Sequence, residues 1–342
     1  MSGLPAGTPA YLRALAAHAG IDAAGVAPPT EDHVQVNGLS LRWLEWGDAA
    51  APPIVLLHGG GQSARTWDAC CMVLARRHRC LALDQRGHGD SAWSPAGAYG
   101  FDDHADDIAA FIDALDLKAP TLVGMSMGGI NALVCAARDP RRLRGLVIVD
   151  VAPEVQFEAV ERMMQGIAAC RRFASPADAA ERLAHLGARR DRALLEATLA
   201  LNLRQQADGG WTWKYDPRTL ADLSAEQILA PRRPLWNVLP RIACPALVVR
   251  GAESQIFSEA DAARFAGTLP RASRVTIAGA RHSVQTDKPA GLAQAIVDFE
   301  EGLAAAPEGR LNRPADTPRT APACRSRSAP GRPPSPPGRR RT

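Results

Sequence analysis

Short apolar runs alternate with longer stretches of helical periodicity along most of this 342-residue chain. Several runs, such as TLVGM and GLVIV, are apolar throughout, which is typical of parallel strands buried on both faces. Strands that alternate with helices indicate βαβ units, so the sequence predicts an α/β fold with a mostly parallel sheet. The expected strands are Leu39–Trp46, Ile54–Leu57, Cys80–Asp84, Thr121–Met125, Gly145–Val149, Ala246–Arg250 and Arg274–Ile277. The expected helices are Arg65–Arg77, Asp102–Leu115, Met127–Arg138, Glu259–Leu269 and Ala290–Leu303.

The alternation stops between residues 155 and 239, where the sequence shows helical patterning and no convincing strand. This segment is therefore expected to be a helical insertion. The pattern divides the chain into an N-terminal extension (1–33), an α/β core (34–154 and 240–303), the insertion, and a tail (304–342).

The tail carries most of the net charge. Its nine arginines and two acidic residues give about +7, so the overall +4 leaves residues 1–303 near −3. A mildly acidic folded part does not favour a nucleic-acid partner. The tail is rich in Pro, Arg, Ser and Gly and has almost no large apolar side chain, so it is predicted to be disordered.

The remaining composition points to a cytoplasmic protein. No window is apolar enough to span a bilayer, and the first twenty residues do not resemble a secretory signal. The seven cysteines lack metal-ligand spacing and are expected to be reduced thiols. We therefore expect no membrane partner and no metal site. The oligomeric state is left open.

The strongest chemical signal is the run Gly124-Met125-Ser126-Met127-Gly128, between an expected strand and an expected helix. This is the G-x-S-x-G pattern in which a sharp strand-to-helix turn exposes a nucleophilic serine. Side chains at Gly124 or Gly128 would collide with neighbouring chain. Ser126 is the predicted nucleophile, and the Met127 N–H is predicted to stabilise an oxyanion.

Three further segments, with this one, make the chain resemble the serine-hydrolase branch of the α/β-hydrolase family. The run His58-Gly59-Gly60-Gly61 looks like the oxyanion loop of that family, so Gly60 or Gly61 is expected to supply a second donor. The run from Asp84 to Ser91 resembles a structural loop. The resemblance implies an eight-stranded sheet. In that sheet Gly145–Val149 corresponds to strand six, and residues 155–239 form a helical lid inserted after it.

The third segment, Gly279 to Ser283, contains His282 where the family places its general base. His282 follows the last expected strand and lies downstream of Ser126, as the family order of nucleophile, acid and histidine requires. His33, His104 and His185 lie elsewhere and are expected at the surface.

The acid of the triad departs from the common pattern of the family. In the family the acid usually lies in the loop after the strand that corresponds to Ala246–Arg250. Here that loop holds Ser254 and Gln255 at the usual positions, and neither can carry a negative charge. Asp150, at the end of the strand GLVIV, is the preferred candidate, and Glu253 is the alternative. A dispensable or absent acid is left open.

The resemblance implies an enzyme that cleaves an ester or a lactone through an acyl-serine, without cofactor. Similar proteins also cleave carbon–carbon bonds, but the run after His282 does not resemble those hydrolases. A ligand-binding protein of the same fold is a further alternative. In the insertion, Trp211, Trp213 and Tyr215 are candidates for an apolar wall against a small acyl or lactone substrate.

A dinucleotide-binding oxidoreductase is the remaining alternative. Residues 59–64 satisfy G-x-G-x-x-A, and Asp84 lies 20 residues beyond Ala64. That interpretation leaves the Ser126 motif and His282 unexplained.

Overall fold

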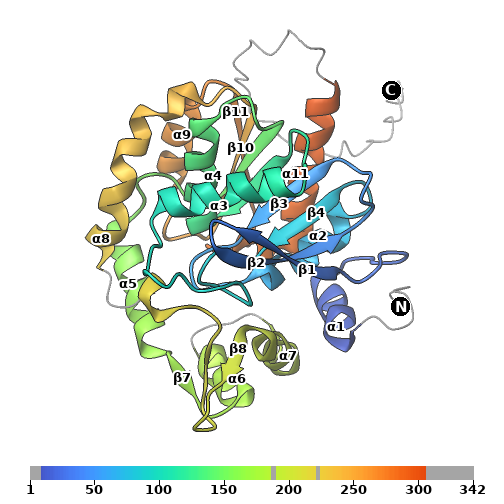
Figure 1. The fold of residues 1–342 in the computed structure, drawn as a ribbon, viewed down its shortest axis with the longest axis vertical. Coiled ribbons are helices and arrows are strands. Elements are labelled where there is room, and N and C mark those ends of the chain that lie inside the picture. Colours follow the sequence, from blue (N-terminus) through green and yellow to red (C-terminus); the bar gives the residue numbers. More distant parts are fainter. Residues whose placement is uncertain (1–8, 186–189, 221–223, 306–342) are drawn as a thin grey trace, which may run out of the picture. The chain divides into compact units, whose positions relative to one another are not determined.

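An eight-stranded sheet forms the centre of the protein in the computed structural model, which describes residues 9–185, 190–220 and 224–305. The strand order is β1-β2-β4-β3-β5-β6-β10-β11 (Figure 1). β2 pairs antiparallel with β1 and β4, and the other neighbouring pairs are parallel. The predicted α/β fold with a mostly parallel sheet is confirmed. The strands are β1 Thr30–Val36, β2 Leu39–Trp46, β3 Pro53–Leu57, β4 Arg79–Leu83, β5 Thr121–Met125, β6 Gly145–Val149, β10 Ala246–Gly251 and β11 Ala272–Ile277.

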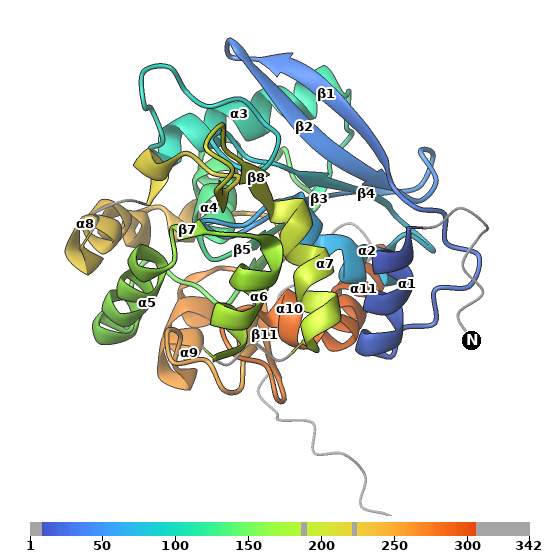
Figure 2. The ribbon, with the colours of Figure 1, turned by 90° about the horizontal axis from the view of Figure 1, so that it is seen from below.

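Helices cover both faces of this sheet. α3 and α4 lie on one face, and α1, α2 and α11 lie together on the other (Figure 2). α9 contributes Phe265 to the core of the first face. The helices around the sheet are α1 Ala10–Ala19, α2 Asp68–Leu74, α3 Phe101–Ala114, α4 Met127–Arg138, α9 Glu259–Thr268, α10 Val284–Asp287 and α11 Pro289–Ala305, with a 3₁₀ turn η1 at Ala64–Trp67.

The strands supply both cores because successive side chains point to opposite faces. In β3, Val55 and Leu57 pack with α3 and α4, whereas Ile54 and Leu56 pack with α2 and α11. All four side chains are fully buried. This explains why the strand sequence is apolar throughout and does not alternate.

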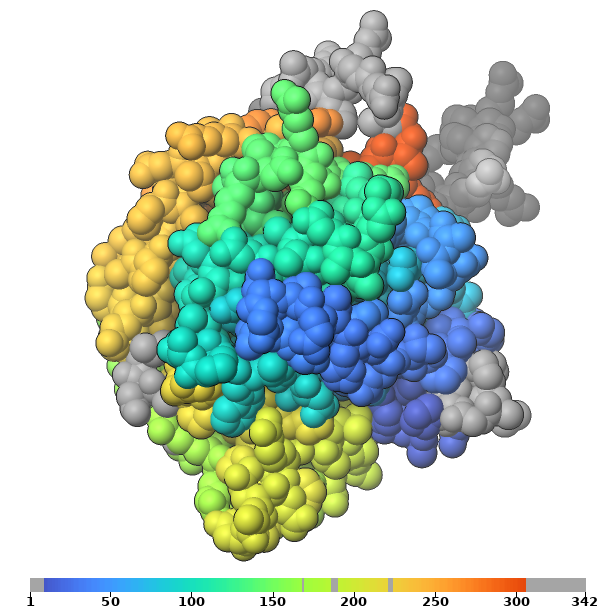
Figure 3. Space-filling view, in the orientation of Figure 1, coloured from blue at the N-terminus to red at the C-terminus, as the bar shows by residue number. Residues whose placement is uncertain are grey.

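The fold begins earlier than the sequence suggested. Helix α1 lies inside the expected extension of residues 1–33, and its Leu12, Leu15 and Ala16 are buried against the α2 and α11 face. Their spacing places them on one side of the helix. β1 also starts before residue 34, and the β1–β2 hairpin (blue) lies beside α3 (teal) in Figure 3.

The segment between β6 and β10 contains strands as well as helices. Its helices were expected, but its three-stranded antiparallel sheet of order β7-β9-β8 was not. Strands of two or three residues are too short to show an alternating pattern. The elements are α5 Phe157–Ala169, β7 Arg172–Phe173, α6 Pro176–His185, α7 Arg192–Asn202, β8 Leu203–Gln205, β9 Trp211–Trp213, η2 Pro217–Thr219, α8 Ala225–Leu229, η3 Ala230–Asn237 and η4 Leu239–Arg241.

Other expectations concern the composition of the chain. Six cysteines are described, and all six are free and buried. Among the described helices, none is long and apolar enough to cross a membrane. The same part of the chain holds no cluster of His, Cys, Asp and Glu suited to a metal ion. The expectation of a disordered tail concerns residues 304–342. Residues 304 and 305 end helix α11, and residues 306–342 lie outside the described residues.

Candidate active site

Ser126 lies at the sharp turn between β5 and α4. Its backbone has φ 52° and ψ −117°, a strained conformation for a residue with a side chain. The two neighbouring glycines make this turn possible. A Cβ on Gly124 would lie 2.3 Å from the Gly128 carbonyl oxygen, and a Cβ on Gly128 would lie 2.4 Å from the Leu57 carbonyl oxygen. The predicted turn is therefore present, and close packing requires both glycines.

His282 connects Ser126 to Asp150. Its Nε2 lies 3.2 Å from Ser126 Oγ, and its Nδ1 lies 2.8 Å from Asp150 Oδ2. Because Asp150 accepts at Nδ1, the neutral ring carries its hydrogen there and presents a lone pair to the serine hydroxyl. The three residues follow β5, β6 and β11, whose carboxyl ends meet at one edge of the sheet.

Asp150 is held by two further hydrogen bonds. The Gly251 N–H donates to Oδ1 at 2.8 Å, and the Ser254 hydroxyl donates to Oδ2 at 2.5 Å. The Asp150 side chain is fully buried, and its backbone has a positive φ of 54°. The other acid candidate, Glu253, has an exposed side chain. The structure thus brings Asp150, and not Glu253, to His282.

The loop of residues 58–61 approaches Ser126 from β3. A Cβ on Gly59 would lie 3.4 Å from Ser126 Cβ and 2.7 Å from Met125 Sδ. Gly60 lines the same cavity as Ser126 and Met127, whereas Gly61 lines a neighbouring pocket. The N–H of Met127 opens α4, so it has no partner inside the helix. Of the two glycines predicted as oxyanion donors, Gly60 is the one in the cavity.

The His58 ring connects this loop to Gln85 by hydrogen bonds. Its Nε2 accepts a hydrogen bond from the Gln85 N–H at 3.1 Å, so Nδ1 carries the hydrogen and donates to the Gly59 carbonyl at 2.8 Å. The Gln85 side chain donates to the His58 carbonyl at 2.7 Å and accepts from Asn131 of α4 at 2.7 Å. Burial lowers the pKa of His58 to about 4, so the ring is neutral near pH 7.

A cavity of about 400 Å³ lies against Ser126 and His282. The inserted segment supplies much of its wall, from α5, α8, η3 and the residues around Leu220. The wall residues from this segment are Met163, Met164, Ile167, Thr219, Leu220, Gln227, Ile228, Pro231 and Arg232. A largely apolar cavity with a few polar groups beside a nucleophile suits a small organic substrate.

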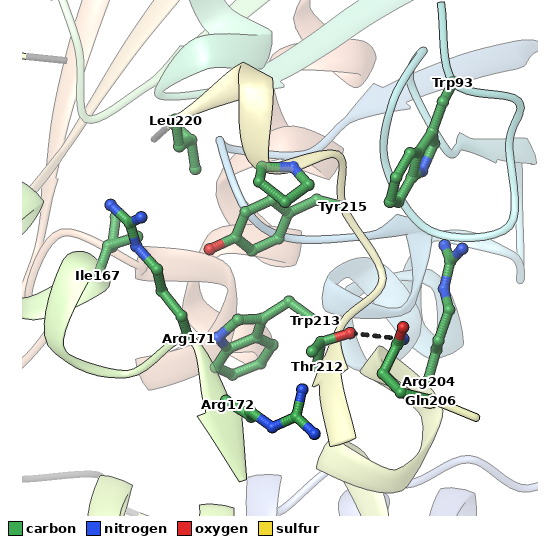
Figure 4. Close-up of a pocket in the computed structure, with 11 residues that line it drawn as sticks. Trp93, Ile167, Arg171, Arg172, Arg204, Gln206, Thr212, Trp213, Tyr215 and Leu220 are labelled. Carbon is green, nitrogen blue, oxygen red and sulfur yellow. Dashed lines mark hydrogen bonds between the residues drawn. The ribbon is translucent and has the colours of Figure 1, made fainter. Parts of the chain in front are cut away.

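The three aromatic residues predicted to contact substrate are not among the cavity-lining residues. Trp213 and Tyr215 line a neighbouring pocket of about 450 Å³, and the described residues that line both it and the cavity are Ile167 and Leu220. Figure 4 shows the two rings in that pocket, with the Arg171, Arg172 and Arg204 side chains around it. Trp211 packs on the small core beside Phe173. A role for the three aromatics in substrate binding stays a prediction.

Asp84 does not have the surroundings that the dinucleotide interpretation requires. It is fully buried, and its Oδ2 accepts from Arg42 at 2.8 Å. Its Oδ1 accepts from the Ala64 N–H at 2.6 Å. Both carboxylate oxygens accept hydrogen bonds from protein groups inside the core, so Asp84 cannot bind the hydroxyl groups of a ribose.

Residues 52–289 match the model of a family described as alpha/beta hydrolase fold. The chain belongs to the α/β-hydrolase family. It is an enzyme of this family, as the sequence predicted, and resembles esterases. Among similar proteins, Esterase Rv0045c of Mycobacterium tuberculosis is 31% identical over 284 residues, which cover 80% of this chain and 90% of that protein. Esterase YbfF of Escherichia coli is 29% identical over 244 residues, or 71% and 91% of the two chains.

The third relative is the 2-(acetamidomethylene)succinate hydrolase of Mesorhizobium japonicum. It is 29% identical over 268 residues, which cover 78% of this α/β-hydrolase and 93% of the relative. A crystal structure of E-2-(acetamidomethylene)succinate hydrolase superposes with a TM-score of 0.72 at 26% identity, covering 80% and 99% of the two chains. A crystal structure of the M. tuberculosis esterase has a TM-score of 0.69 at 30% identity, covering 87% and 99%.

Among the described cavity residues that the sequence did not predict, Arg232 is the one with a permanent charge. It lines the cavity, yet its side chain is only 7% exposed. In the sequence it stands beside a second arginine in PRRP, which reads as a surface turn. No spacing rule separates the buried arginine from the exposed Arg233.

Proposed function

We propose that this α/β-hydrolase is a serine hydrolase that cleaves a carboxylic ester or lactone of a small molecule through an acyl-enzyme on Ser126. The observation that carries the proposal is the hydrogen-bonded series from Ser126 Oγ to His282 and Asp150, at 3.2 and 2.8 Å, beside a cavity of substrate size. The esterase names of two relatives support an ester bond as the target.

In the first step, Ser126 Oγ attacks the carbonyl carbon, and its proton moves to His282 Nε2. The negative charge on the carbonyl oxygen is stabilised by the N–H groups of Met127 and Gly60. Asp150 keeps the Nδ1 hydrogen of His282 in place and stabilises the ring when it becomes positive. His282 then gives the proton to the leaving oxygen as its bond to the carbonyl carbon breaks. The alcohol of an ester departs, whereas the new hydroxyl of a lactone stays attached to the acyl group.

In the second step, water takes the place of the alcohol. His282 removes a proton from water as its oxygen attacks the acyl carbon, and it returns that proton to Ser126 Oγ when the acid leaves. The inserted segment acts as the lid of the cavity, because its side chains form the wall above Ser126. These steps use only side chains and backbone groups of this chain.

A fluorophosphonate probe and a panel of p-nitrophenyl esters and lactones test the proposal. The probe is expected to label the native protein at Ser126, and the panel to include hydrolysed members. Ser126→Ala should remove both signals. Labelling that persists in this variant, or a native protein that neither reacts with the probe nor cleaves any ester, would contradict the proposal.

A further inference from the structure

Arg232 is a buried cation in the wall of the cavity that holds Ser126. It lies near the start of η3, and it lines the cavity together with Ser126 and His282. Its side chain is 7% exposed. An arginine in this position has little contact with bulk water, so its charge must be stabilised by protein groups or by a ligand.

The protein groups that are described do not balance this charge. Within the described ranges Arg232 forms no ion pair and no hydrogen bond, and its Nε is buried without a partner. The guanidinium lies over the face of Phe101, with its Cζ 5.6 Å from the ring centroid. The neighbouring Arg233 differs, because it is exposed and its Nη1 lies 2.8 Å from Glu226 Oε1.

The cavity itself supplies no counter-charge either. None of its described lining residues is an Asp or a Glu, and His282 is the only other basic one. Burial lowers the pKa of Arg232 to about 10, which still leaves the guanidinium positive near pH 7. The cavity therefore has a fixed positive charge at one point of a largely apolar wall.

We propose that Arg232 binds a carboxylate of the substrate, so that the enzyme selects anionic esters over neutral ones. The planar guanidinium can donate two parallel hydrogen bonds to a carboxylate, and both charges are stabilised when they pair away from water. The substrate class is a carboxylate-bearing ester or lactone of a size that fits about 400 Å³. This inference rests on the proposed hydrolysis at Ser126.

Matched pairs of substrates test the selection. On the acyl side, mono-p-nitrophenyl adipate is compared with its neutral methyl ester. On the alcohol side, 4-carboxyphenyl acetate is compared with 4-(methoxycarbonyl)phenyl acetate. In at least one pair, the native enzyme should favour the anionic member in kcat/KM by about 10- to 100-fold, the range of one charged hydrogen-bonded contact.

Three variants assign the preference to a residue. Arg232→Met should lower the ratio of anionic to neutral kcat/KM to near one, and Arg232→Lys should retain part of it because it keeps the charge without the planar fork. Arg233→Gln is the matched control, and its ratio should equal that of the native enzyme. The Arg232→Met protein should also melt at a higher temperature, because a buried charge without a partner is replaced by an apolar side chain.

A binding measurement separates this inference from the proposed hydrolysis. Adipate should raise the Tm of Ser126→Ala, and should not raise that of Ser126→Ala/Arg232→Met. If no ester is cleaved but this shift is found, the hydrolase proposal fails and the carboxylate site stands. If esters are cleaved without anionic preference in either pair, or with a preference that survives in Arg232→Met, the Arg232 inference is overturned.

Discussion

Ser254 donates a hydrogen bond to the same Asp150 oxygen that faces His282. The Ser254 Oγ to Asp150 Oδ2 distance is 2.5 Å, and His282 Nδ1 lies 2.8 Å from that oxygen. With the Gly251 N–H on Oδ1, three donors fix the carboxylate in one orientation. The loop after β10, where the family usually places its acid, therefore positions a carboxylate that comes from β6.

Replacing Ser254 by Ala should lower kcat about tenfold with little change in KM, because Asp150 loses a donor that orients it. The variant should also lose about 1 to 2 kcal/mol of stability, since Ser254 Oγ accepts from the N–H groups of Ile256 and Phe257. Ser258→Ala is the matched control, because Ser258 caps α9 through the Asp261 N–H. It should be less stable by about 1 kcal/mol and keep its kcat. Equal kcat values for the two variants would rule out positioning by Ser254.

Replacing Asp150 by Asn should lower kcat by roughly 10² to 10⁴ with little effect on KM, because the amide favours the wrong tautomer of His282. Glu253→Gln should change kcat by less than about tenfold, since the exposed Glu253 side chain is not the partner of His282. Steady-state kinetics with one p-nitrophenyl ester compare the two. The reverse ranking would assign the acid to Glu253.

Substitutions at Ser126 should separate activity from stability. Ser126→Ala should abolish hydrolysis and leave the Tm close to that of the native protein. Ser126→Gly should also be inactive, but more stable by about 1 kcal/mol, because glycine accepts the φ of 52° without strain. Thermal melts and p-nitrophenyl ester assays measure both effects. A native Tm for the glycine variant would mean that the turn stores no strain.

Acidification should destabilise the fold through buried neutral histidines. Burial lowers the pKa of His58 to about 4 and that of His88 to about 3, whereas an unfolded histidine titrates near its ordinary 6.5. Between the folded and unfolded pKa values, the unfolded chain binds more protons than the folded protein. The free energy of unfolding is therefore highest above pH 6.5 and falls as the pH decreases below it. Each such histidine contributes about 1.4 kcal/mol per pH unit within its window.

His88→Phe tests this pH dependence, because His88 Nε2 is buried without a partner among the described residues. Urea unfolding at pH 7, 6 and 5 should show an average slope that is smaller by about 1 kcal/mol per pH unit, because an unfolded histidine is only partly protonated at pH 7. His33→Gln, at an exposed position of β1, is the control and should keep the native slope. An unchanged slope in His88→Phe would contradict a neutral buried His88.

The α/β sheet and the proximity of Ser126, His282 and Asp150 could be predicted from the sequence because both depend on local patterns. The turn at Ser126 is encoded by glycines that pack against backbone, and parallel strands by unbroken apolar runs. Asp150 was preferred over Glu253 from its place at the end of a strand, together with the family resemblance, and its Oδ2 lies 2.8 Å from His282 Nδ1.

Features that depend on contacts between distant segments could not be predicted in the same way. The core was predicted to begin at residue 34, although α1 already packs on the α2 and α11 face of the sheet. The apolar face of α1 has only three buried residues, which is too few for a clear helical pattern in the sequence. His104 was expected at the surface, but it is buried on α3. Trp213 and Tyr215 line a pocket beside the cavity of Ser126, and their contact with substrate stays a prediction. The burial of Arg232, beside an exposed Arg233, is set by how η3 packs in the folded chain, so the sequence offered no signal for it.

The origin of the His282 partner in β6 also affects how such enzymes are recognised. Asp150 is held from this side by the Ser254 hydroxyl and the Gly251 N–H, and neither contact requires a carboxylate in the loop after β10. A search template that requires a carboxylate at position 254 or 255 would classify the chain as a pseudoenzyme. A template defined by the carboxylate oxygen nearest to histidine Nδ1, whichever strand supplies it, would find Asp150 beside His282.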